Sequence, residues 1–597
     1  MHRPPKVNWY EPRQLLDTAI RTVVSGMLGK MIDTRRLAAL DGGTDDECVI
    51  HRDEGFESFD FMADTGDGWD ATFTMAFLLT APELEVDGRR LPRSDALILG
   101  GDEVYPVASD QAYRERLIGP FEAARKAVSE RFERRRLPRK PVFLIPGNHD
   151  WYDSLSSFNH RFIERKTKDF GSFKPQQKRS YFVIKLSHGW EIWGIDVQLG
   201  RNIDDRQFKF FSAHAKTLTP SSKVILCSAE PDRVYGNLSG RPLRFTMIRI
   251  CRLVFLRQAR LVAIFAGDVH NYQRYEELQV HGDIRYTRQH VVSGGGGAFL
   301  HPTHAFPKES PHNRVQVGEP KALYPSPDVS RRLTRQLPLF AFRNTGMALL
   351  CCTLYTLMFW TGDLPSSWTE LLLYPISHLA STVLIVASIL GGWVFARSGV
   401  RATVHEPAES PAAGHASTAD TSGPSNEDDE DDENARDAKD EPESLRQEMR
   451  HDRSRFIPWI AQVLGFGHGV AHVALAYLCW RAALAWTPST PPAGLDAGLW
   501  SVAREYLIRL EVFGAGLLLA GTLFGCYLWL ALNVFRFHHN EAFSAIGSTR
   551  YKNFLRCRVR SENQVEVTVI GVDKTYGPEV GPHPVPLRII ETFTLEA

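Results

Sequence analysis

The stretch VFLIPGNHD, residues 142–150, joins a short apolar run to three polar side chains. The run Val142–Ile145 is typical of a buried strand. Asn148, His149 and Asp150 follow it directly, at the strand end where layered α/β sheets hold their ligands. The pattern therefore predicts that these three side chains face a binding site at one edge of a sheet.

Other apolar runs between residues 59 and 293 have the same character, because each is bounded by Gly, Asp, Asn or His. They are Phe59–Ala63, Ala96–Leu99, Ile192–Ile195, Val224–Leu226, Val262–Ala266 and Val291–Ser293. Helix-like sequence such as residues 111–136 lies between the early runs. This alternation predicts strand–helix–strand units that build a layered α/β fold.

Polar motifs follow four of these runs: ADTGD at 63–67, GGDEVY at 100–105, PGNHD at 146–150 and AGDVH at 266–270. Their order and their placement resemble the calcineurin-like metallophosphoesterase superfamily over about residues 59–300. The resemblance implies a metallophosphoesterase β-sandwich flanked by helices, which hydrolyses a phosphate ester through metal-activated hydroxide. Carboxylates, a side-chain amide oxygen and imidazoles are ligands that suit two such cations.

The resemblance also assigns roles to single residues. Asp102 should bridge the two metal ions, Asp64 and His270 should hold the first ion, and Asn148 the second. His149 should protonate the leaving-group oxygen or stabilise charge on the phosphoryl group, and Asp150 should orient it.

The first motif departs from the common family pattern. Gly66 stands where many members have a histidine ligand, and the second motif has the form Gly-Asp-x-x-Tyr. This pairing resembles the purple acid phosphatase branch, which implies that Tyr105 is a metal ligand. An aromatic side chain that only packs at a strand end is the alternative, and Asp67 is a rival ligand for the same position.

Two further departures affect the second metal site. The histidine expected after the run Val224–Leu226 is replaced by Ala229, with Glu230 beside it, and Asp268 replaces the first histidine of the last motif. The second ion would then be held by oxygen donors from Asp102, Asn148, Asp268 and Glu230. We expect this set to favour Mn or Fe, with Zn and Mg as alternatives, although loss of the histidine could also weaken the site.

The segment GGGGAFLHPTH, residues 294–304, follows the last apolar run. Its glycines would let the backbone approach a phosphate or the metals, whereas a flexible turn is the plainer interpretation. We predict that His301 and His304 contact substrate.

The second half of the chain contains four stretches without Asp, Glu, Lys or Arg that are long enough to cross a bilayer. They are Asn344–Gly362, Leu371–Ala396, Phe456–Trp480 and Val512–Phe535. Arg and Lys are concentrated at one side of these stretches, and the loops 363–370 and 487–505 on the other side have little positive charge. This bias predicts a multi-pass membrane protein with the catalytic domain and both termini in the cytoplasm. His468 and His472, one turn apart in the third stretch, are either functional or hydrogen-bonded within a helix bundle.

The predicted organisation has six parts: an amphipathic helix region (1–50), the catalytic domain (51–335), two membrane helices (344–396), an acidic disordered linker (401–450), two more membrane helices (456–535) and a β segment (536–597) that packs on the catalytic domain from the same side. The stripe of apolar residues from Leu15 to Ile32 could also lie on lipid.

Composition narrows the function further. Lys+Arg and Asp+Glu both number 70, so we expect no nucleic-acid partner. The eight cysteines form no Cys-x-x-Cys pair and should stay reduced.

The hypothesis is a membrane-anchored dinuclear-metal phosphoesterase that acts on a lipid phosphate or a nucleotide, with membrane lipid as a partner. The alternative is a degenerate, non-catalytic protein that binds a phosphorylated ligand or signals through its helices; the sequence does not indicate an oligomeric state.

Overall fold

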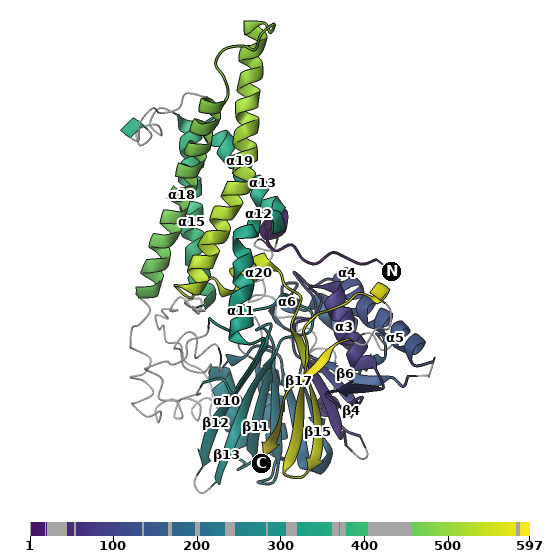
Figure 1. Ribbon diagram of the computed structural model, residues 1–597. Coiled ribbons are helices and arrows are strands. Elements are labelled where there is room, and N and C mark those ends of the chain that lie inside the picture. The colour runs from purple at the N-terminus through teal and green to yellow at the C-terminus, as the bar shows by residue number, and fades with distance from the viewer. Residues whose placement is uncertain are drawn as a thin grey trace, which may run out of the picture.

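The computed structural model describes residues 2–596 except for 18–19, 21–44, 53–54, 134–136, 165–169, 198–202, 233, 235–244, 282–283, 306–318, 361–368, 371–377, 404–455 and 581–584. A catalytic domain of two facing sheets carries a stem of long helices at one end (Figure 1). Most of the predicted amphipathic helix and nearly all of the acidic linker lie outside the described residues.

The first sheet has seven strands, and its order joins the two ends of the chain. The order is β17 (Leu587–Glu596), β16 (Gln564–Val572), β15 (Lys552–Ser561), β2 (Ser58–Met62), β5 (Ala96–Leu99), β6 (Lys140–Leu144) and β7 (Phe173–Pro175). β2 pairs parallel with β5 and antiparallel with β15. The C-terminal segment therefore completes the sheet that begins near the N-terminus, and β17 is a strand that the periodicity did not indicate.

The second sheet has eight strands, mostly parallel in its centre. The order is β1 (Val49–Ile50), β8 (Phe182–Lys185), β9 (Trp190–Ile195), β10 (Lys223–Ser228), β11 (Arg260–Ala266), β13 (Ile284–Ser293), β12 (Tyr272–His281) and β14 (Ala322–Tyr324). A separate hairpin consists of β3 (Glu83–Val86) and β4 (Arg89–Pro92).

The core lies in three layers. Phe59, Phe61 and Phe143 of the first sheet pack against Phe182 and Trp190 of the second, so the sheets form a β-sandwich. Helices α3 (Trp69–Thr80) and α5 (Gly119–Arg131) cover the outer face of the first sheet. Helices α8 (Asp205–Ala215) and α10 (Phe245–Phe255) cover that of the second. This mixed α/β architecture agrees with the expected metallophosphoesterase fold.

The stem consists of α13 (Thr345–Met358), α15 (Leu379–Thr403), α18 (Phe456–Trp486) and α19 (Ala497–Asn533). In the part of the chain that the structure describes, three apolar segments are long enough to cross a membrane: Leu379–Gly399, Trp459–Trp486 and Ala497–Asn533. A fourth crossing requires the bent pair Pro327–Arg343 and Thr345–Met358, which meet at 61°. The fourth predicted stretch began at Val512, whereas α19 begins fifteen residues earlier and carries charged residues such as Arg504 and Glu511. A stretch without charged residues predicts the part of a helix that can lie in lipid. It does not predict where the whole helix begins and ends.

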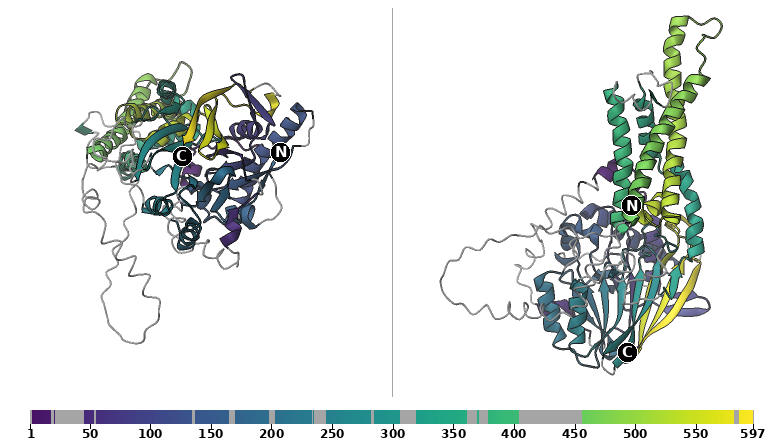
Figure 2. Two further views of the ribbon diagram at one scale, coloured as in Figure 1. Left: turned by 90° about the horizontal axis from the view of Figure 1, so that it is seen from below. Right: turned by 90° about the vertical axis from the view of Figure 1, so that its left-hand side faces the viewer.

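The stem and the catalytic domain meet at α20 (His539–Ile546), which follows α19. Phe299 and Leu300 of the glycine-rich segment pack in one cluster with Leu528 and Leu532 of α19 and Phe543 of α20. The side view in Figure 2 shows the helices rising from the same end of the domain to which the motif-bearing strands lead.

Candidate metal centre

The predicted site residues lie together because the carboxyl ends of the parallel strands meet at one edge of the sandwich. The amides of Asp64 and Thr65, after β2, donate to the carbonyls of Gly101 (2.9 Å) and Asp102 (3.0 Å), after β5. Across the sandwich, the amide of Asp268, after β11, donates to Asp64 Oδ1 (3.1 Å). The first, second and last motifs are therefore neighbours in space.

The Tyr105 hydroxyl occupies the centre of this group. It lies 3.0 Å from Asp64 Oδ1, 3.3 Å from Asp102 Oδ2 and 3.0 Å from His270 Nε2. Its rival Asp67 lies apart, because its two carboxylate oxygens accept from the amides of Val7 (3.1 Å) and Phe299 (3.0 Å). Between the two candidates, the phenol is the one that faces the other predicted ligands of the first ion.

The backbone at the three motif aspartates is in the left-handed region. The φ angles are 61° at Asp64, 52° at Asp102 and 64° at Asp268. Non-glycine residues adopt this region at a cost, and such strain concentrates at functional sites. Glycines give the carboxylates room: a Cβ on Gly147 would lie 2.1 Å from Asp102 Oδ1, and one on Gly294 would lie 2.3 Å from Asp64 Oδ2.

Asn148 lies against Asp102. The inner polar atom of its amide is 3.0 Å from Asp102 Oδ2 and 3.2 Å from Oδ1. With nitrogen inward the amide donates to the carboxylate, and with oxygen inward three oxygens converge with no proton between them. The second arrangement is one that a bound cation stabilises. The outer atom contacts the Tyr152 hydroxyl at 3.1 Å in either orientation.

Asp268 and Glu230 complete the acidic cluster. The amide of Asp268 donates to Asp64 Oδ1 (3.1 Å), and the Asp268 charge contributes to the raised pKa of Asp64. Glu230 is buried, and its charge contributes to the raised pKa of Asp102. Ala229 packs closely on Gly101, because a Cβ placed on Gly101 would lie 2.7 Å from the Cβ of Ala229.

The charge balance of the cluster favours cations. Burial, followed by the charges of Asp102 and Asp268, raises the pKa of Asp64 well above its usual range. Burial, followed by the charge of Asp150, does the same for the pKa of Asp102. Asp64 Oδ2 is buried and has no hydrogen-bond partner among the described residues. A buried, unpaired carboxylate oxygen in an acidic cluster is satisfied by a metal ion, so this donor set fits the expected cofactor.

No three His, Cys, Asp or Glu side chains in the described part of the chain converge closely enough to hold a metal ion by themselves. The Tyr105 hydroxyl and the Asn148 amide, which are not of these types, occupy the centre instead.

His149 is half-buried beside the centre, with its Nδ1 2.6 Å from the carbonyl oxygen of Pro106. Burial lowers the pKa of His149, and the contact with Pro106 opposes that shift. Asp150, which was expected to orient His149, accepts from the amides of Glu103 (3.2 Å) and Gly147 (2.9 Å) and from the Tyr113 hydroxyl (2.6 Å). Asp150 therefore stabilises the loop that carries the motif PGNHD, and the Pro106 carbonyl orients the His149 ring.

The two histidines of the glycine-rich segment differ in position. The His301 ring stacks on the His270 ring at a centroid distance of 4.0 Å, and its Nε2 lies 3.2 Å from Asn540 Oδ1 at the start of α20. His304 lies further away, with Nδ1 2.7 Å from the Ser330 hydroxyl. Only His301 is placed next to a predicted ligand.

Two residues near the centre lie outside the four motifs and were not among the predicted site residues. Trp9 places its ring edge-on to those of Tyr105 and His149. Lys552, on β15, is fully buried and donates to the carbonyl of Ala298. Burial lowers the pKa of Lys552 to about 7, against the opposing charges of Asp67 and Asp64. Neither residue could be found from local patterns, because each is brought to the site by a segment distant in sequence.

Comparison with known protein families gives one match. Residues 58–272, less than half of the chain, match the family model for calcineurin-like phosphoesterase. This match supports a phosphate-ester hydrolase. The comparison with curated proteins gave no match.

Two solved structures are similar in part. A purple acid phosphatase from yellow lupin (Lupinus luteus) seeds has 12% identity and a TM-score of 0.27 over 43% of this chain and 46% of its own. The structure of PhoD has 10% identity and a TM-score of 0.28 over 41% of this chain and 58% of its own. The chain thus spans about half the length of each of these two structures.

Proposed function

We propose that this protein is a membrane-anchored phosphoesterase that uses two metal ions at the carboxyl edge of its β-sandwich. The observation that carries the proposal is the convergence of Asp64, Asp102 and His270 on the Tyr105 hydroxyl. The family match over residues 58–272 supports the same reaction class.

Asp64, Tyr105 and His270 would hold the first ion, Asp102 would bridge, and Asn148, Asp268 and Glu230 would hold the second. The oxygen-rich second set favours Mn or Fe over Zn, with Mg as a further candidate. When bound, the ions would polarise the phosphoryl oxygens and lower the pKa of the attacking water.

His149 would bind and release a proton on the side of the phosphoryl group opposite the metal ions. Its Nδ1 is engaged by the Pro106 carbonyl, which leaves Nε2 to face the substrate. Burial lowers the pKa of His149, so the negative charge of a bound phosphate ester is what would favour a proton on Nε2. From there the proton can pass to the leaving-group oxygen or stabilise phosphoryl charge.

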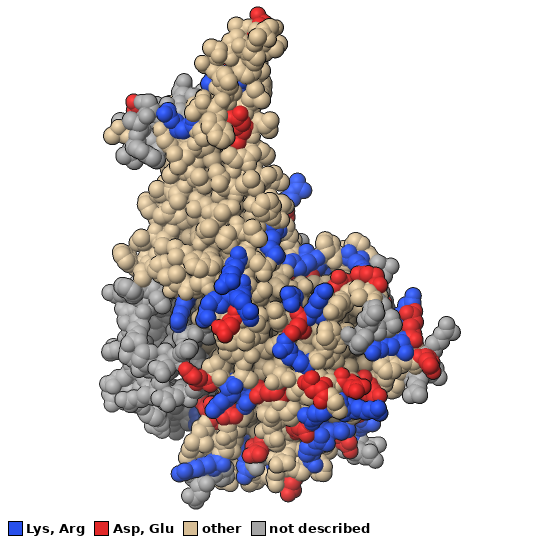
Figure 3. Space-filling model, in the orientation of Figure 1, with Lys and Arg blue, Asp and Glu red and all other residues tan. Residues whose placement is uncertain are grey.

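For the substrate we favour a lipid phosphate over a nucleotide. His270 is linked through His301 to Asn540, only seven residues beyond the end of α19. Figure 3 shows a stem with few charged side chains and a band of Lys and Arg where it meets the catalytic domain. Exposed arginines there include Arg331, Arg332 and Arg335. Such a band matches anionic lipid headgroups, and membrane lipid would be a partner as well as a source of substrate.

The test uses purified full-length protein in detergent, loaded with Mn and assayed on an aryl phosphate. We expect His149→Ala to lower turnover by about two to four decades while metal content stays near that of the wild type. Asp102→Ala should lose metal. If the metal-loaded wild type binds phosphate but hydrolyses nothing, the protein is a non-catalytic relative, the alternative to which the replacement of histidine by Ala229 points.

The substrate class needs a second assay on the same protein. A long-chain lipid phosphate in mixed micelles should be hydrolysed with a higher kcat/KM than a nucleotide at equal concentration. Preference for the nucleotide would reject the lipid assignment and leave the phosphoesterase assignment intact.

A further inference from the structure

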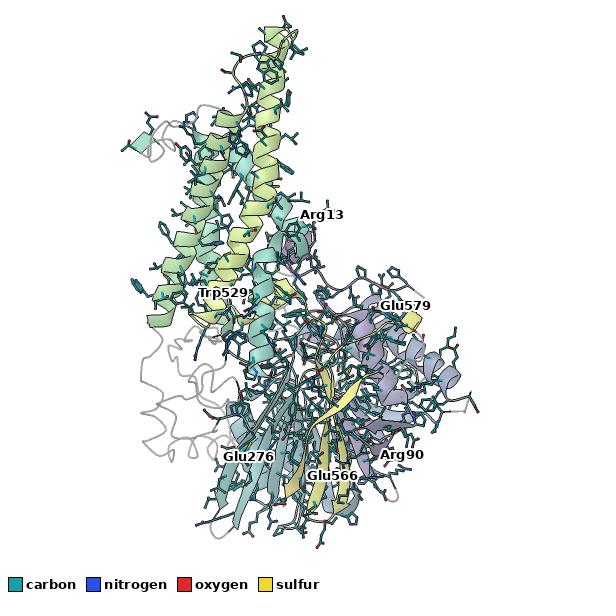
Figure 4. The ribbon with its side chains drawn as sticks, viewed as in Figure 1. Arg13, Arg90, Glu276, Trp529, Glu566 and Glu579 are labelled. Carbon is teal, nitrogen blue, oxygen red and sulfur yellow. The ribbon has the colours of Figure 1, made fainter. Side chains whose placement is uncertain are left out.

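The first residues of the chain form a strap across the catalytic edge. This N-terminal strap, residues 2–11, runs from the C-terminal part of the catalytic domain to the stem (Figure 1). At one end, Arg3 Nη1 donates to Glu579 Oε2 (2.5 Å), and its guanidinium lies 4.8 Å from the centre of the Trp69 ring. At the other end, the Tyr10 hydroxyl donates to the carbonyl of Glu541 (2.9 Å). Figure 4 labels Glu579 near the first end and Arg13 just beyond the second.

The middle of the strap is fastened as well. Lys6 Nζ donates to the Gly547 carbonyl (2.5 Å), Arg116 Nη2 donates to the Pro5 carbonyl (3.1 Å), and the Val7 amide donates to Asp67 Oδ1 (3.1 Å). Val7 is buried against Tyr105 and Ala298. A segment without regular secondary structure that is held at so many points has a fixed path, so the side chains between these points are pre-positioned.

Trp9 lies between two of these points, directly at the candidate metal centre. The centroid of its ring is 5.9 Å from that of Tyr105, 5.8 Å from that of His149 and 5.5 Å from that of Phe299, each in an edge-on arrangement. It is thus adjacent to a predicted ligand of the first ion and to the residue predicted to transfer a proton. The rings of Tyr105 and His149 are themselves in contact, with centroids 4.5 Å apart, so a phosphate ester that binds against this pair also lies beside the indole.

The indole also carries an unused donor. Trp9 Nε1 is buried and has no hydrogen-bond partner in the described part of the chain. An indole N–H that loses water without gaining an acceptor is destabilising, and it is satisfied when a ligand brings the acceptor. Phosphoryl oxygens are strong acceptors, and an N–H that donates to a charged oxygen forms a stronger bond than one that donates to a neutral group.

We propose that Trp9 is a substrate-contacting residue, whose Nε1–H donates to an oxygen of the bound phosphate ester while its ring forms a wall of the site beside His149. The inference rests on the proposed function, because it takes the centre to be the place where the ester binds. The strap thereby makes the N-terminus part of the active site, and Tyr10, which packs on Phe340 and Phe524, ties that wall to the stem.

The experiment compares Trp9→Phe with the wild type in the metal-loaded full-length protein. Phe keeps an aromatic ring and removes the donor. We expect KM for an aryl phosphate and the inhibition constant of inorganic phosphate to rise together by about tenfold, with kcat within about twofold of the wild type. Trp9→His, which returns a ring N–H, should recover part of the loss.

Trp69→Phe is the matched control. Trp69 Nε1 is also buried without a described partner, and its ring stacks on Phe73 in α3 and faces the Arg3 guanidinium. Phe at this position keeps a ring for both contacts, so the strap stays fastened and only the indole donor is lost. Its loss should leave KM and phosphate inhibition unchanged. If Trp9→Phe behaves like Trp69→Phe, or if Trp9→His is no better than Trp9→Phe, the proposal is overturned while the phosphoesterase assignment stands. A wild type that neither hydrolyses the ester nor binds phosphate would instead reject the proposed function.

Discussion

Glu191 is a carboxylate in β9 that stabilises the second sheet through three partners. His214 Nε2 lies 2.8 Å from its Oε2, Trp193 Nε1 donates to the same oxygen (3.0 Å), and Lys185 pairs with Oε1. Burial is the largest single influence on this group and would raise its pKa, but the three partners together outweigh it and lower the pKa from 4.5 to about 2. Because the folded-state pKa is depressed, the stabilisation is complete above about pH 4.5 and is lost as the pH falls towards 2.

Glu191→Gln should therefore destabilise the protein by up to about 3 kcal/mol at pH 7 and by much less near pH 2.5. Chemical denaturation followed by tryptophan fluorescence measures the difference at each pH. Glu130→Gln, at an exposed position on α5, should change little at any pH. A loss for Glu191→Gln that is the same at both pH values would show that the carboxylate's charge contributes nothing.

Asp268 bears on metal preference, because an oxygen donor stands where the resemblance expects an imidazole. Zinc binds imidazole readily, whereas Mn and Mg accept all-oxygen shells. We predict that metal-free protein regains more activity with Mn than with Zn at equal free-metal activity, and that Asp268→His shifts both activity and bound-metal content towards Zn. A wild type that already prefers Zn would contradict the assignment of Asp268, Asn148 and Glu230 as an oxygen-donor set.

At the scale of elements, the strands that carry motifs were predictable and several others were not. β5 matches its apolar run residue for residue, and β2, β6 and β11 differ from theirs by one or two residues at the ends. When an apolar run is followed by Gly-Asp or Gly-Asn, these residues indicate where the strand ends. β17 alternates less clearly, with half-exposed positions through most of its length, so no local pattern marks it.

The same distinction applies to the site. Asp64, Asp102, Asn148 and His270 lie within short motifs, so their meeting follows from the parallel order of their strands. Trp9 and Lys552 reach the centre only through the strap and through the pairing of β15 with β2. Contacts between segments roughly 100 to 500 residues apart leave no trace in a window of ten residues.

A buried ion pair joins β15 to β2. Arg556 binds both oxygens of Asp60, with Nε to Oδ1 at 2.9 Å and Nη2 to Oδ2 at 3.0 Å, and both side chains are buried. Arg556→Ala leaves the Asp60 charge unpaired, so we expect a loss of about 3–5 kcal/mol in unfolding free energy. Arg560→Ala on the same strand removes only an exposed pair with Glu566 and should cost less than about 1 kcal/mol. Equal effects in denaturation would contradict the β15–β2 pairing.

At the scale of the whole molecule, the first sheet constrains how often the proposed membrane anchor could cross a bilayer. β2 and β15 are hydrogen-bonded neighbours, with Phe61 opposite Leu555 and Phe59 opposite Cys557. A sheet cannot pair across a bilayer, so the segment between residues 62 and 552 must cross an even number of times. The three long apolar segments among the described residues give an odd number. We therefore propose that the bent pair Pro327–Arg343 and Thr345–Met358 supplies the fourth crossing.

This parity predicts where inserted tags are accessible. The loop 488–495, between α18 and α19, is fully exposed and should face outward, whereas both termini should lie with the arginine-rich end of the stem in the cytoplasm. In intact cells, added protease should remove a tag at 490–494 and spare tags at either terminus, and in inverted vesicles the pattern should reverse. Termini found on opposite sides would require an odd number of crossings. That result would break the first sheet and, with it, the placement of Lys552 beside the candidate metal centre.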